Sequence, residues 1–132
     1  MAKWINDSAL DAALTYVCGT NGGNGRSLVA CSAQPTTYTE AYVTYALADV
    51  ALTPGDGEGD FTIGNGDSSG RKLTTAQQSN VTVDASGTAT HVAIVDTTGS
   101  ALLAVTTCTS FALTSGSTVT FPAFDFEIAD PV

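Results

Sequence analysis

The chain has 132 residues and a formal net charge of −9, from four basic and thirteen acidic residues. Such a chain lacks the clustered cations that neutralise phosphates, so binding to nucleic acid or to anionic membranes is disfavoured. Its start signals neither export nor a membrane anchor, and no stretch reaches the roughly twenty apolar residues that span a bilayer. Its length suits one domain, residues 1–132, and its abundant Thr, Ser and Gly favour strands and turns.

One helix is expected near the N-terminus, over Asn6–Val17, because Asn6 or Asp7 can cap it and apolar residues recur on one face. The glycine-rich segment Thr20–Gly25 predicts a loop, and Ser27–Ala33 a short buried strand. The pattern of Tyr38–Leu52 fits helix in part and strand in part, so both alternatives stay open.

The segment Pro54–Gly70 is expected to be a long exposed loop with one short strand at Phe61–Ile63, because it holds six glycines and four carboxylates. The part from Asp56 to Asp67 has the oxygen-ligand spacing of a calcium loop. However, Phe61 stands where that loop needs Gly, and Asp67 stands where it needs the longer Glu. A solvated acidic loop that does not need calcium is therefore expected.

The C-terminal half predicts successive antiparallel strands joined by tight turns. They are Val81–Val83, Thr88–Val95, Ala101–Thr107 and Thr118–Ile128. In the last run the apolar alternation changes phase at Pro122–Ala123, which predicts a bulge or bend there and puts Phe124, Phe126 and Ile128 on the buried face. The fold class expected is mostly β, a β-sandwich or small barrel of antiparallel sheets, with one short N-terminal α-helix.

No residue pattern predicts a catalytic, cofactor-binding or metal site, so the chain is not expected to be an enzyme. His91 is the one histidine and is expected to be packed or on the surface, because the sequence shows no partner for it. Cys18, Cys31 and Cys108 are odd in number and widely spaced, which predicts buried free thiols in a reducing compartment.

Arg71 and Lys72 form the one adjacent basic pair. They are expected to pair with nearby carboxylates, and the alternative is that they anchor the chain to an acidic patch on a partner.

Several segments together resemble a group of small structural proteins of tailed bacteriophages and prophages. The segments are Lys3–Leu14, Cys31–Ala41, Ser69–Lys72, Ser86–His91 and Ala123–Pro131. The resemblance implies a β-rich virion structural protein that forms oligomers. It also implies that the chain is made in the cytoplasm of the bacterial host and incorporated into the particle.

The function expected from this resemblance is that of a capsid decoration (cement) protein on the surface of the head. Such a protein binds the major capsid protein and stabilises contacts between shell subunits, and it associates with itself as a dimer or trimer. The residues expected to contact the shell are Trp4, Ile5, Arg71 and Lys72, with Trp4 as the anchor.

The alternative expectation is a tail or tail-fibre module that binds another tail protein or a host glycan. The glycan version requires aromatic side chains to gather in a shallow groove. The candidates are Trp4, Tyr38, Tyr42 and Tyr45.

Overall fold

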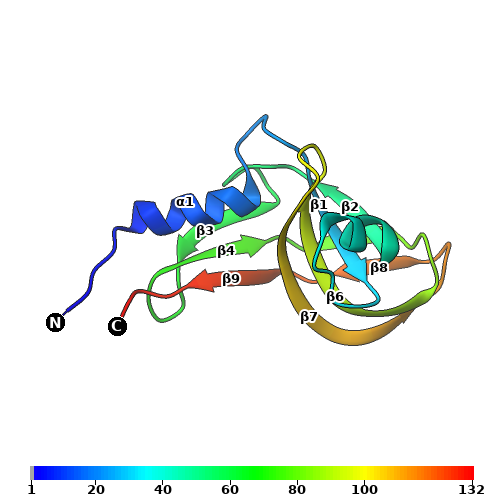
Figure 1. The fold of residues 1–132 in the computed structure, drawn as a ribbon. Helices are drawn as coiled ribbons and strands as arrows, with labels where there is room; N and C mark the ends of the chain where they lie inside the picture. The colour runs from blue at the N-terminus through cyan, green and yellow to red at the C-terminus, as the bar shows by residue number, and fades with distance from the viewer. Residues whose placement is uncertain (1) are drawn as a thin grey trace. The chain divides into compact units, whose positions relative to one another are not determined.

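The computed structural model describes residues 2–132, and strands dominate it (Figure 1). Its helices are α1 (Asp7–Cys18) and the single-turn π-helix η1 (Glu40–Thr44). Its strands are β1 (Arg26–Cys31), β2 (Ala46–Leu52), β3 (Phe61–Asn65), β4 (Arg71–Thr75), β5 (Gln78–Thr82), β6 (Gly87–Asp96), β7 (Ala101–Leu113), β8 (Thr118–Phe121) and β9 (Phe124–Ile128). The expected class, mostly β with one short N-terminal α-helix, is confirmed.

The strands form three antiparallel sheets, with the orders β2-β1-β6-β7, β3-β4-β9 and β5-β8. The chain packs as two compact units, each described here by itself. The first unit comprises residues up to Gly23, Thr53–Gln77 and Pro122–Val132, and the second comprises Asn24–Leu52 and Gln78–Phe121. That the whole chain acts as one domain stays a prediction.

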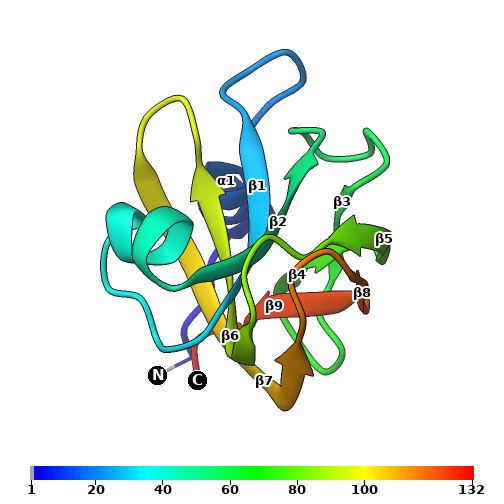
Figure 2. The same ribbon diagram turned by 90° about the vertical axis from the view of Figure 1, so that its right-hand side faces the viewer.

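In the second unit, β1 lies between β2 and β6, and all six of its residues are buried (Figure 2). Its apolar run Leu28–Cys31 reads as an interior strand because both faces are covered. The strand ends at Cys31, two residues before the predicted end. The predicted buried strand is thus confirmed in place, with a shorter extent.

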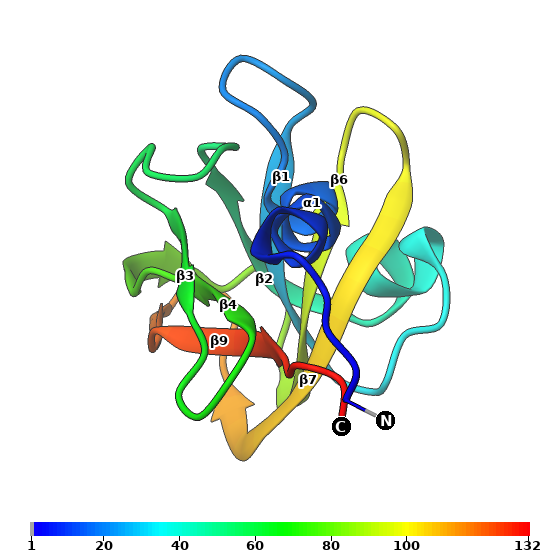
Figure 3. The same cartoon turned by 90° about the vertical axis from the view of Figure 1, so that its left-hand side faces the viewer.

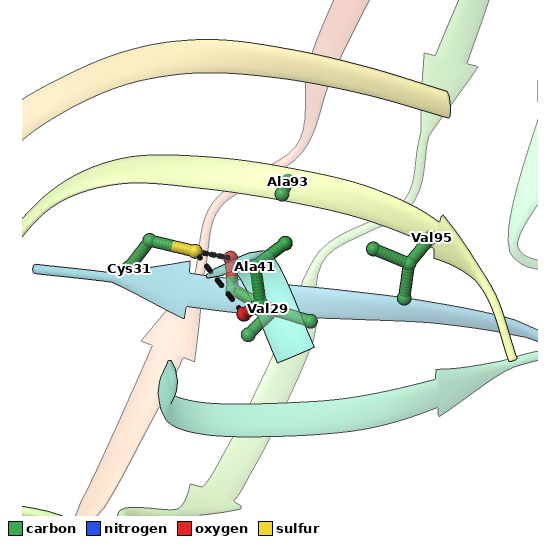
Figure 4. Packing of buried hydrophobic residues seen from close by; sticks show 5 residues of the cluster. All are labelled: Val29, Cys31, Ala41, Ala93 and Val95. Atoms are coloured by element: carbon green, nitrogen blue, oxygen red, sulfur yellow. Dashed lines mark hydrogen bonds between the residues drawn. The ribbon is translucent and has the colours of Figure 1, made fainter. Parts of the chain in front are cut away.

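The ambiguous segment Tyr38–Leu52 contains both of the structures that its pattern suggested. Its first part forms η1, closed by the Tyr45 N–H donating to the Glu40 carbonyl at 2.8 Å, and its second part forms β2. Ala41 of η1 is fully buried and belongs to one apolar cluster with residues of β1 and β6 (Figure 4). The buried members of this cluster are Val29, Cys31, Ala41, Ala93 and Val95.

A buried charged group joins the start of β1 to the turn between β6 and β7. The Arg26 guanidinium, 7% exposed, lies 3.5 Å from the Asp96 carboxylate, and the two residues are direct partners in the β1–β6 register. Asp96 also accepts hydrogen bonds from the Thr98 and Gly99 N–H groups at 2.9 and 2.7 Å, and from the Asn24 amide at 3.0 Å. One carboxylate therefore closes the hairpin turn and fixes β1 beside it.

In the first unit, α1 packs on β3 and β4, and β4 lies between β3 and β9 (Figure 3). The helix begins as predicted, because the Asn6 side chain accepts from the Ser8 N–H at 2.8 Å. Leu10 and Leu14 of the predicted apolar face are buried and Val17 is half-buried, whereas Ala13 is exposed and Cys18 is buried in addition. The predicted helix is confirmed, with its end one residue later.

The last predicted strand, Thr118–Ile128, is in fact two strands that belong to different sheets. β8 pairs with β5 and β9 pairs with β4, and Pro122–Ala123 connects them. The predicted phase change is therefore correct in place, but it arises from a change of sheet. Along β9 the side chains alternate between half-buried and exposed, with Phe126 on the inner phase and Asp125 on the outer.

Two further expectations about strands need correction. β7 continues to Leu113 rather than ending at Thr107, because its Thr and Ser residues stay in the sheet. Of the predicted succession of neighbouring strands, only β6 and β7 pair directly within residues 2–132; β5 and β8 form a sheet of their own. The expected strand at Phe61–Ile63 is confirmed and extends to Asn65.

We predict that Asp96→Asn lowers the free energy of unfolding by about 3–5 kcal/mol, because it leaves the buried Arg26 without its counter-charge. Chemical denaturation at pH 7 measures the loss. The matched control is Asp130→Asn, which neutralises an exposed carboxylate. Equal effects of the two variants would contradict a special role for Asp96.

The same pair predicts a pH dependence. The Gly99 N–H, then the Asn24 amide and Arg26, hold the pKa of Asp96 below its ordinary value. This contribution to stability is complete above the unfolded pKa of about 3.9 and is lost as the pH falls through the lowered folded value. The stability gap between the wild type and Asp96→Asn should therefore close below about pH 4. A gap that stays constant down to about pH 2 would contradict this.

Candidate functional site

The N-terminal residues carry the one tryptophan of the sequence, and its side chain is largely exposed. Residues 2–6 have no regular secondary structure, and the Trp4 side chain is 81% exposed. Ile5 beside it is half-buried, and α1 begins two residues later. Tyr16 of α1 is also exposed, at 71%, but it is not one of the predicted contact residues. Trp4 thus presents a large side chain that a partner could cover.

Arg71 lies at the start of β4, and its guanidinium group forms an ion pair within the first unit. Its guanidinium donates to both carboxylate oxygens of Asp11 in α1, at 2.6 and 3.3 Å, and to the side-chain oxygen of Asn65. The hydrogen bond to Asp11 is the main cause that raises the pKa of Arg71. The expected pairing of Arg71 with a nearby carboxylate is confirmed, and it ties the helix to the sheet.

Lys72 is paired in the same way. Its ammonium group donates to the Asp67 carboxylate and lies 3.7 Å from Asp125 on β9. The bond to Asp67 is the main cause that raises the pKa of Lys72. Since both basic heads already hold carboxylates, a partner would have to compete for them. Their role in partner binding stays a prediction, and of the four predicted contact residues Trp4 has the most accessible side chain.

The acidic loop uses its carboxylates to hold its own backbone. Asp56 accepts from the Ile63 N–H at 2.8 Å, and Asp60 accepts from the Thr53 N–H at 2.6 Å. The Asp67 carboxylate forms an ion pair with the Lys72 ammonium group. Among residues 2–132, no three His, Cys, Asp or Glu side chains come together in a way that could hold a metal ion.

His91 lies in β6 directly opposite Cys31 of β1. The Cys31 thiol donates to the Ala41 carbonyl at 3.5 Å, and burial, with a smaller effect of Cys108, raises its pKa to about 11. A thiol with that pKa stays protonated at neutral pH. The second contact of His91 is the Thr90 hydroxyl, 2.9 Å from Nδ1.

Cys18, Cys31 and Cys108 are all free thiols, as the sequence predicts. Cys18 and Cys31 are fully buried, whereas Cys108 on β7 is half-buried. The expectation of buried thiols is therefore correct for two of the three.

A polar cluster that the sequence did not reveal lies on the second unit. The Tyr42 hydroxyl of η1 is hydrogen-bonded to Ser27 of β1 and to Asp49 of β2, and Asp49 is hydrogen-bonded to the Asp84 carboxyl. Burial, followed by the hydrogen bond and the like charge of Asp84, raises the pKa of Asp49. Asp49 therefore carries its charge at a cost in the folded state. No short-range motif marks this cluster, because its members come from four separate segments.

The edge strand β7 is a second feature that the sequence did not reveal. Only β6 pairs with it among the described strands, and its Phe111 side chain is 61% exposed. The one available signal was the absence of any Asp, Glu, Lys, Arg or His between Asp96 and Asp125. That absence predicts a strand shielded from water, whereas β7 lies at an edge.

Comparison with known proteins adds no relative: no protein-family model, curated protein or solved structure matches the chain. Among the described residues, no helix has the length and apolar character that crossing a membrane would require. The functional argument therefore rests on the residues themselves.

We predict that calcium leaves the melting temperature unchanged, because Asp56, Asp60 and Asp67 are already engaged with donors of the chain. Thermal melts with added calcium and with a chelator measure this. A large rise with calcium that the chelator reverses would show that these carboxylates rearrange into a binding loop.

We further predict that Asp49→Asn stabilises the protein at pH 7 by about 1 kcal/mol, because it replaces a like-charge contact by a hydrogen bond. The folded state raises the pKa of Asp49, so the cost of this group is complete above that pKa and disappears as the pH falls through it. The gain from Asp49→Asn should shrink accordingly in acid.

Asp84→Asn provides the matched variant, because it removes the same repulsion from the other side. Denaturation midpoints of both single variants and of the double variant test the pair. A lower midpoint for either single variant at pH 7 would contradict a destabilising like-charge contact between Asp49 and Asp84.

Proposed function

We propose that this chain is a structural protein of a bacteriophage particle, a decoration protein that binds the outer surface of the head and clamps neighbouring subunits of the shell. It acts as a small symmetric oligomer, a dimer or trimer, on the major capsid protein. The observation that carries the proposal is the 81% exposed Trp4 on a segment without regular secondary structure. The resemblance of several segments to phage structural proteins supplies the setting.

An exposed tryptophan is costly for a protein in water and effective as an anchor at an interface. Its large rigid side chain loses little conformational freedom when a pocket closes around it. Residues 2–6 can take the shape of a partner groove because no helix or sheet fixes them in advance, while α1 holds their end in place through its cap at Asn6. A short arm on a rigid body is a suitable device for gripping a shell surface.

Clamping does not require a large interface in each copy. When an oligomer contacts several shell subunits at once, the second contact forms at a high effective concentration, so modest single-site affinities multiply. Removing one shell subunit then requires breaking several contacts together. A domain of this size can stabilise a shell in this way without any chemical step.

The alternative of a glycan-binding tail module has less support from the aromatic side chains. Tyr38 and Tyr42 stack with ring centroids 5.4 Å apart, and with Tyr45 they pack against the apolar cluster around Val29. These tyrosines serve as a cover for the core of the second unit. This packing favours the decoration role over the glycan alternative.

The test compares particles with and without the chain. Heads stripped of the protein should come apart at a lower temperature, and adding it back should restore their stability. Trp4→Ala should weaken binding to stripped heads by roughly 30-fold, the effect of losing about 2 kcal/mol at a central anchor. Tyr16→Ala removes another exposed aromatic side chain and serves as the matched control, with little expected effect.

Cryo-EM of the intact particle locates the chain independently of any variant. Density on the head surface across junctions of shell subunits is the expected result. Density confined to the tail, or unchanged head stability after complete removal, would overturn the decoration role and favour the tail module.

A further inference from the structure

The outer edge of β7 is an unpaired strand edge. β7 is the last strand in the order β2-β1-β6-β7 and forms the long curved ribbon of Figure 1. In an antiparallel pair, every second residue turns its N–H and C=O away from its partner. Among the strands that the structure describes, β7 pairs only with β6, so its outward backbone groups have no strand partner.

This edge carries none of the charges by which natural proteins usually block edge strands. β7 contains no Lys, Asp, Glu, Arg or Pro, although the chain as a whole has a net charge of −9. Bulges interrupt its register between Ala89 and His91 and between Ile94 and Val95 of β6. Between these bulges, Ala104–Thr107 pairs without interruption, and this stretch is a regular strand edge.

The side chains of β7 also suit a covered position better than an exposed one. Phe111 is 61% exposed, although aromatic side chains at strand positions are usually covered by a neighbour. Thr106 and Thr107 lie in the regular stretch, and threonine pairs across neighbouring strands stabilise a sheet. β7 therefore has the composition of an interior strand, although it lies at the edge of its sheet.

We propose that β7 pairs with β7 of a second copy of this chain, antiparallel and around a two-fold axis, so that two four-stranded sheets join into one. The charge distribution of the chain favours a second copy as the partner of the β7 edge. Two chains of −9 repel each other, and a contact along the uncharged run between Asp96 and Asp125 places no like charges opposite each other. A basic partner would gain nothing from this edge.

Identical antiparallel strands are self-complementary, so one surface supplies both sides of a closed dimer. Only the biological role of the dimer rests on the proposed function: a dimer provides the multivalency needed to clamp a shell. The pairing itself is a property of the purified chain.

Sedimentation of the purified full chain over a range of concentrations tests the pairing. The wild type should sediment as a dimer. Thr107→Lys, at an exposed position of the regular stretch of β7, should raise the dimer dissociation constant at least roughly ten-fold, because a charged lysine on an edge strand opposes pairing with another strand. Thr62→Lys makes the same change at an exposed position of β3 and should leave the dimer intact.

Hydrogen exchange provides a readout that does not depend on the variants. Amides of Ala104–Thr107 should gain protection as the concentration rises through the dimer range, and those of β3 should not. A monomer at all concentrations, a dimer that Thr107→Lys leaves unchanged, or exchange in β7 that ignores concentration would each overturn the pairing. A monomer would leave binding to stripped heads measurable by itself, so the two proposals fail separately.

Discussion

The second unit depends on one buried carboxylate. Asp96 ends β6, closes the turn into β7 through two backbone N–H groups, and faces Arg26 at the start of β1. Because every residue of β1 is buried, a slip of one residue would turn its apolar side chains to the wrong face. The Arg26–Asp96 pair opposes such a slip, since a displaced Arg26 would be a buried charge without a partner.

That fixed register positions the surfaces to which function is assigned. With β1 in place, η1 packs on the sheet and its Tyr42 is hydrogen-bonded to Ser27 and Asp49. In the strand order β2-β1-β6-β7, β7 then lies at the edge of the sheet. In the first unit, the Arg71–Asp11 pair plays a similar part, because it holds α1 on β4 and thereby the start of the segment that carries Trp4. Internal charges fix the scaffold, and uncharged groups are left for contact.

Features set by interactions between residues close in sequence could be predicted, whereas features set by contacts between distant segments could not. The helix was predictable because its cap at Asn6 and its apolar spacing act within a few residues. The phase change at Pro122–Ala123 was visible for the same reason, but that β8 and β9 join different sheets depends on β5 and β4, far away in the chain. The exposure of Trp4 was expected, whereas the Asp49–Asp84 contact and the edge position of β7 are set by sheet order alone.

The division of the chain has a consequence for the order of folding. The chain passes between the two units at Gly23, Leu52, Gln77 and Phe121, so neither unit corresponds to a continuous stretch of sequence. During synthesis, the four-stranded sheet can close once β7 has emerged, whereas β4 must wait for β9, which follows β7 and β8 in the chain. Until then β4 exposes an open edge to which other nascent chains can pair.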